Sequence, residues 1–175
     1  MKKNLITPAL IVLIMMALPV SCKEKRPSDL SKESIIPKPV SVVSTGDYFI
    51  MKPKCKIFVY GESEEMKLAG QYLAEKLKSM TGIDTKIKTA SGEPWSGNIF
   101  LQLSDVNKEL GDEGYELTIT KQLVKLTALK PAGLYRGVQT IRQVLSSDAD
   151  TVSKKNKCLA IYNIHLYLLI LLIIF

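Results

Sequence analysis

The sequence has little of what metal sites and nucleophilic catalysis require. It contains one histidine, His165, and three cysteines at positions 22, 55 and 158, which stand far apart and form no zinc-binding pair. Its one Asp-Glu dipeptide is Asp112-Glu113. We therefore expect no metal site, no catalytic triad built on histidine and no bound cofactor.

The sequence also lacks runs of like charge. The chain of 175 residues has 24 Lys and Arg against 17 Asp and Glu, a net charge of +7. Residues 35–147 hold 15 basic and 12 acidic residues, and the two signs are interspersed. Because a nucleic-acid site needs a clustered basic surface, we predict that nucleic acid is not a partner.

Residues 1–22 have the pattern of an export signal. Lys2 and Lys3 precede an apolar run over residues 5–18, and the segment ends in Ser21-Cys22. This pattern resembles a bacterial lipoprotein signal, in which Cys22 is lipidated and becomes the mature N-terminus; the alternative is ordinary secretion with an incidental cysteine. We expect an exported protein of the bacterial cell envelope, lipid-anchored on the periplasmic side or in the outer membrane.

The polar residues 23–34 predict a flexible tether, and residues 35–147 predict one folded domain. Its clearest element is a helix over residues 62–80, with apolar residues at three- and four-residue steps. Ser63 is the expected N-cap, and Gly82 is the expected C-terminal stop. A second helix is predicted from Pro131 to about Leu145. Cys55 is expected to be a small buried hydrophobic residue.

The strands predict an α+β fold, in which two main helices pack on one face of a mixed sheet. Two short strands are expected at residues 41–43 and 48–51 around a turn at 45–47. Others are expected at 55–60, at 84–89 with edge lysines, at 98–104, and in a hairpin formed by 114–120 and 123–129.

The last part of the chain, residues 148–175, is an apolar tail after Lys154, Lys155 and Lys157. Two interpretations compete: a C-terminal membrane anchor, or out-of-frame sequence that follows a frameshift or premature stop. We favour the second, because a lipidated N-terminus and a C-terminal membrane span seldom need each other.

Three stretches of the folded part carry a resemblance to a known family. They are residues 35–40 (IIPKPV), 112–119 (DEGYELTI) and 132–145 (AGLYRGVQTIRQVL). In this order and spacing they resemble the small, non-catalytic N-terminal domain of bacterial β-N-acetylhexosaminidases of glycoside hydrolase family 20. The resemblance ends near Ser147. Gly133 and Gly137 share one helical face, which indicates close approach either of the sheet in this domain or of a neighbouring domain.

The resemblance implies enzymes that remove terminal N-acetylhexosamines from glycans, with the acetamido oxygen of the substrate as nucleophile. Their catalytic Asp-Glu pair lies on a (β/α)₈ barrel, which this sequence does not contain. Asp112-Glu113 lies inside the small-domain motif, so we interpret it as part of a turn. No catalytic residue is carried over to this chain.

The leading hypothesis is therefore a truncated, β-N-acetylhexosaminidase-like lipoprotein, inactive alone, whose domain supports the catalytic barrel in full-length relatives. The alternative is a stand-alone, lipid-anchored module that binds glycan or protein. Trp95, Tyr115 and Tyr135 are its candidate sugar-stacking residues, although Tyr115 and Tyr135 are expected to lie in the core.

Overall fold

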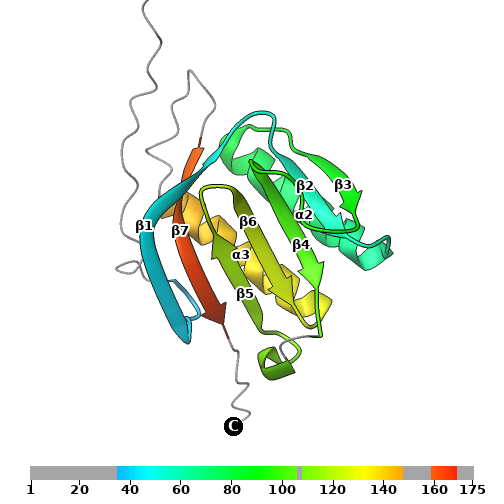
Figure 1. Ribbon diagram of the computed structural model, residues 1–175, viewed down its shortest axis with the longest axis vertical. Helices are drawn as coiled ribbons and strands as arrows, with labels where there is room; N and C mark the ends of the chain where they lie inside the picture. Colours follow the sequence, from blue (N-terminus) through cyan, green and yellow to red (C-terminus); the bar gives the residue numbers. More distant parts are fainter. Residues whose placement is uncertain (1–34, 106–107, 148–158, 169–175) are drawn as a thin grey trace, which may run out of the picture.

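The computed structural model describes residues 35–105, 108–147 and 159–168. Within these ranges seven strands form one sheet in the order β1-β7-β5-β6-β4-β2-β3, and the helices α2 and α3 lie side by side across one face of it (Figure 1). The α+β class, the mixed sheet and the placement of both helices on one face are as predicted. The signal, the tether and Cys22 lie outside the described residues.

The sheet combines parallel and antiparallel pairs. Its strands are β1 (Ser41–Met51), β2 (Lys56–Tyr60), β3 (Lys86–Ala90), β4 (Asn98–Leu103), β5 (Tyr115–Ile119), β6 (Leu123–Ala128) and β7 (Leu159–Leu168). β2 pairs in parallel with β3 and β4, and β4 pairs in parallel with β6. β5 pairs antiparallel with β6, as the hairpin pattern predicts, and also with β7. Lys86 and Lys88 are exposed on β3 at the sheet edge, as expected.

The helix α2 (Glu64–Thr81) differs by one or two residues from the predicted range 62–80, and both predicted caps, Ser63 and Gly82, are confirmed. The hydroxyl of Ser63 accepts a hydrogen bond from the backbone N–H of Met66 at 3.2 Å. At the other end Gly82 has a φ of 69°, and its N–H donates to the carbonyl of Lys78 at 2.9 Å. These caps satisfy backbone groups that the helix leaves without partners, so the sequence fixes both ends locally.

The core lies between the helices and the sheet, and α3 (Pro131–Ser147) approaches the sheet most closely at its glycines. A Cβ added to Gly133 would lie 2.2 Å from the carbonyl oxygen of Gly114, and one added to Gly137 would lie 2.2 Å from Cδ1 of Leu126. The two glycines therefore serve packing within this domain, which settles the choice that the sequence left open.

The first strand differs from the prediction. Two short strands around a turn at 45–47 are expected, but β1 is one strand that pairs with β7 on both sides of an irregularity. Ser44 pairs with Ile164 and Tyr48 with Tyr162, so residues 45–47 lie opposite the single residue 163. A bulge thus absorbs the turn residues, and pairing with β7 continues past them.

Sequence analysis assigned no strand to residues 159–168, where the structure has β7 between β1 and β5. In this strand Asn163, His165 and Tyr167 alternate with apolar residues, but the uninterrupted apolar residues 168–175 that follow make the tail as a whole also fit a membrane segment. In the part of the chain that the structure describes, no helix is long and apolar enough to cross a membrane.

The start of the domain is fastened to α3. The side-chain amide of Gln143 accepts a hydrogen bond from the backbone N–H of Ile36 at 2.9 Å and donates one to its carbonyl at 2.7 Å. Residues 35–40, the first of the three resembling stretches, are thereby held against the last turns of α3.

Candidate functional site

The two faces of the sheet differ in chemistry because strand residues alternate between them. Leu117, Val124 and Leu126 are buried toward the helices, whereas their neighbours Thr118 and Lys125 lie on the opposite face, here called the helix-free face. A groove of about 660 Å³ runs over this face. Ten of its twelve lining residues have polar side chains; the lining comprises Glu93, Pro94, Ser96, Gln102, Ser104, Glu116, Thr118, Thr120, Gln122, Leu123, Lys125 and Thr127.

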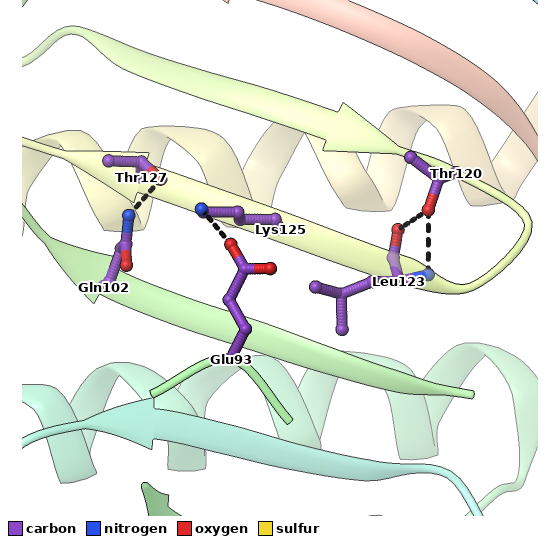
Figure 2. Close-up of polar contacts among 6 residues, drawn as sticks. All are labelled: Glu93, Gln102, Thr120, Leu123, Lys125 and Thr127. Carbon is purple, nitrogen blue, oxygen red and sulfur yellow. Dashed lines mark hydrogen bonds and ion pairs between the residues drawn. The ribbon is translucent and has the colours of Figure 1, made fainter. Parts of the chain in front are cut away.

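Two polar contacts organise the middle of the groove. Figure 2 shows Glu93, on the loop before β4, reaching across to Lys125 of β6, with which it forms an ion pair. Beside it the amide nitrogen of Gln102 on β4 donates to the hydroxyl of Thr127 on β6 at 3.1 Å. The helices lie behind the sheet in this view, so these side chains project from the helix-free face.

One end of the groove is closed by the β5–β6 turn. The hydroxyl of Thr120 donates to the carbonyl of Leu123 at 3.1 Å and accepts from the Leu123 N–H at 3.0 Å (Figure 2). The N–H of Gly97 donates to the carbonyl of Gln122 at 2.6 Å, which ties the loop before β4 to this turn. The rim of the groove is therefore built from two loops that hold each other.

Trp95 lies on that loop, between two residues that line the groove, Pro94 and Ser96. Its side chain is 91% exposed, the largest exposure among the described large hydrophobic residues. The amide of Asn98 donates to the Trp95 carbonyl at 2.8 Å, and its oxygen accepts from the Lys56 N–H at 3.0 Å. The exposed indole is thus carried by a backbone that is anchored to β2.

The other two aromatic candidates lie elsewhere. Tyr115 is fully buried, and its hydroxyl is hydrogen-bonded to that of Thr140 on α3. Tyr135 is half-buried and packs edge-on against Tyr72 of α2, with ring centroids 5.4 Å apart. The expectation of a core position is confirmed for Tyr115, whereas Tyr135 packs at the edge of the core between the helices. Of the three candidates, only Trp95 presents an open ring.

Two buried side chains are held in their neutral forms. Burial raises the pKa of the Cys55 thiol from 9.0 to about 12. Burial likewise raises the pKa of Tyr115 from 10.0 to about 12, and the hydrogen bond from Thr140 only partly offsets it. Because the thiolate is the reactive form of cysteine, Cys55 is a packing residue and not a nucleophile, as predicted.

The Asp112-Glu113 pair precedes β5 and lies outside the groove. Glu113 forms an ion pair with Arg136 of α3 at 3.0 Å. This contact links the turn before the hairpin to the helix that follows it. Within the described residues, no group of three His, Cys, Asp or Glu side chains could hold a metal ion.

Comparison with known proteins identifies the family. Residues 32–161 match the family model of glycosyl hydrolase family 20, domain 2. The chain belongs to glycosyl hydrolase family 20. The β-hexosaminidase of Porphyromonas gingivalis is 30% identical over 118 residues, which are 67% of this chain and 15% of that protein.

Solved structures of the family share this fold. The β-N-acetylhexosaminidase of Streptomyces coelicolor superposes with a TM-score of 0.64 at 33% identity, over 81% of this chain and 27% of its own. The Streptomyces plicatus enzyme gives a TM-score of 0.65 at 31% identity, over 83% and 28% of the two chains. This chain thus spans less than a third of each of these relatives. The family match runs to residue 161, into β7, and so extends past Ser147.

The groove has only a partial signal in the sequence. Glu116 and Thr118 alternate visibly with the core positions of β5, but Glu93 meets Lys125 across 32 positions of sequence. Such a pairing depends on β4 and β6 being neighbours in the sheet, which no local pattern encodes.

Proposed function

We propose that this domain is the non-catalytic support domain of a family 20 β-N-acetylhexosaminidase and that hydrolysis belongs to a (β/α)₈ barrel packed against it. The observation that carries the proposal is the family 20 domain 2 match over residues 32–161, combined with the placement of the Asp112-Glu113 pair. Glu113 is engaged with Arg136 at a turn, and neither Asp112 nor Glu113 lines the groove, whereas acid catalysis requires the carboxyl groups to lie within hydrogen-bond reach of the substrate.

The outer face of the helices is the proposed surface for the barrel. Tyr72 of α2 packs against Tyr135 of α3 and is hydrogen-bonded to Gln139, which joins the two helices on their outer side. Nearby on α2, Lys76 lies 4.9 Å above the Tyr72 ring and Leu68 is 47% exposed. A surface with two aromatic rings and an exposed leucine suits a contact with another domain.

A domain exchange tests this function. Residues 35–168 would replace the matching domain of the Streptomyces coelicolor hexosaminidase, and hydrolysis of 4-nitrophenyl N-acetyl-β-glucosaminide would be followed. We expect the chimera to hydrolyse the substrate with the KM of the parent enzyme, because the substrate meets only the barrel, and we expect the full chain alone to release no nitrophenol. Turnover by the full chain alone would refute the non-catalytic assignment.

We also propose that the protein is exported to the bacterial cell envelope and lipidated at Cys22. The support is the sequence of residues 1–22, in which a charged start and an apolar run lead to Ser21-Cys22. Cells grown with radiolabelled palmitate should label the wild-type chain and leave Cys22→Ser unlabelled. Equal labelling of the two proteins would exclude Cys22 as the lipidated residue.

The alternative function is a lipid-anchored module that binds glycan by itself. The exposure of Trp95 beside a polar groove favours this alternative, and its neighbourhood supports a more specific assignment, argued next.

A further inference from the structure

A sugar chain has apolar surfaces and hydrogen-bonding surfaces, and the region of the groove on the helix-free face has groups complementary to both. A pyranose ring has an apolar face of C–H groups and an equator of hydroxyls. Trp95, whose two chain neighbours Pro94 and Ser96 line the groove, has an aromatic ring that is 91% exposed. Amide and hydroxyl side chains, among them Gln102, Thr118 and Thr127, line the floor. The volume of about 660 Å³ lies in the range of small-molecule sites, about 300–1,000 Å³.

The polar groups of the floor can both donate and accept hydrogen bonds, as sugar hydroxyls do. Gln102 uses one N–H on Thr127, and an amide group has a second N–H and a carbonyl oxygen to offer. The hydroxyl of Thr127 can still donate while it accepts from Gln102. These groups stand on neighbouring strands of a hydrogen-bonded sheet, so little side-chain and backbone ordering is needed when a ligand binds.

The charges of the groove favour a neutral ligand. Among the described residues that line it, the basic one, Lys125, is paired with Glu93, and Glu116 adds a second carboxylate. An anionic ligand would meet two carboxylates and a cation that is already engaged. Phosphate groups, nucleic acid and acidic polysaccharides are therefore disfavoured.

We propose that this groove binds a neutral oligosaccharide containing N-acetylhexosamine, with one sugar ring stacked on Trp95 and its neighbours hydrogen-bonded to Gln102 and Thr127. The choice of sugar rests on the proposed function, because the relatives are β-N-acetylhexosaminidases. A barrel docked on the helices would leave the helix-free face open. The groove would then hold a glycan chain at a second place, away from the catalytic centre.

The sole tryptophan of the chain makes the test direct, because Trp95 is the only source of tryptophan fluorescence. The full chain in mild detergent would be titrated with chitotetraose, the tetramer of N-acetylglucosamine. We expect a saturable blue shift, since stacking on a sugar removes water from the indole. Calorimetry should show that Trp95→Ala weakens binding about tenfold or more. A titration without a saturable shift would overturn the proposal.

Three variants separate the site from general effects. Thr127→Val and Gln102→Leu should each weaken binding severalfold while the Trp95 emission of the free protein stays unchanged. Tyr60→Ala removes another exposed aromatic ring, 46% exposed, which lies on β2 and, unlike Trp95, has no lining residue as a chain neighbour; it should leave the affinity unchanged. Equal loss of binding in Tyr60→Ala and Trp95→Ala would show that the groove is not the site.

The last comparison uses a charged oligosaccharide. A hyaluronan tetrasaccharide has similar length but a carboxylate on alternate sugars, and we expect it to bind at least about tenfold more weakly than chitotetraose. Tighter binding of hyaluronan would contradict the neutral assignment. Oligosaccharide binding is measured on the chain without a barrel, whereas the domain exchange measures hydrolysis by the chimera. A negative result in either experiment therefore leaves the result of the other valid.

Discussion

Replacing Gly133 with alanine is expected to destabilise the domain by about 3 kcal/mol, the upper part of the range for overpacked cores. The added Cβ would lie 2.2 Å from the carbonyl oxygen of Gly114 and 2.9 Å from Cβ of Ala128. Both atoms belong to or adjoin the strand backbone, so neither can turn away. Alanine favours a helix over glycine by about 1 kcal/mol, which is too little to offset a clash of this size.

The measurement is urea unfolding followed by far-ultraviolet circular dichroism. Gly92→Ala is the matched control, since its Cβ would meet nothing within 4 Å and its stability should equal that of the wild type. Gly137→Ala should be intermediate, because its Cβ meets the buried side chain of Leu126, which is able to shift in part. A Gly133→Ala domain as stable as the wild type would mean that α3 lies farther from β5 and β6.

The second large effect is a loss of stability at alkaline pH. Below pH 9 the Cys55 thiol and the Tyr115 hydroxyl are protonated in both folded and unfolded chains. Their pKa values of 9.0 and 10.0 rise to about 12 in the folded domain, so at higher pH the unfolded chain binds fewer protons. The free energy of unfolding should therefore fall as pH rises from 9 to 12, by roughly 5 kcal/mol in all.

Tyr115→Phe isolates one of the two groups. At pH 7 it should cost about 1 kcal/mol, because the hydroxyl of Thr140 loses its buried partner. Between pH 10 and 12 its free energy of unfolding should fall less steeply than that of the wild type. Tyr60→Phe, at an exposed position, is the control and should keep the wild-type slope. An unchanged slope in Tyr115→Phe would show that the Tyr115 hydroxyl is not shielded from water.

The elements that the sequence predicts are those with local signals. α2 has a cap at Ser63, a stop at Gly82 and an apolar stripe between them, so its limits need no tertiary information. The β5–β6 hairpin has two alternating runs and a short turn for the same reason. β7 is different, because it lies in a tail whose apolar composition also fits a membrane segment or foreign sequence, and its pairing with β1 and β5 is not encoded locally.

The candidate site was predictable only in part. Trp95, among loop-forming glycine, serine and proline residues, is recognisable in the sequence as a possible sugar contact. The groove below it is not, because Glu93, Gln102 and Thr127 come together through the order of strands in the sheet. The same limit applies to Arg136, whose partner Glu113 lies across the hairpin. Strand order is set by packing over the whole domain, and local sequence does not encode it.

The most direct measurement is the thermal unfolding midpoint of the barrel in the chimera with the Streptomyces coelicolor enzyme, compared for Leu68→Lys and Tyr60→Lys. The two residues are 47% and 46% exposed; Leu68 lies on α2, whereas Tyr60 alternates on β2 with the buried Val59 and so faces away from the helices. If the helices support the barrel, Leu68→Lys should lower the midpoint and Tyr60→Lys should not. Equal midpoints for Leu68→Lys and the unmodified chimera, or a lower midpoint only for Tyr60→Lys, would contradict the account.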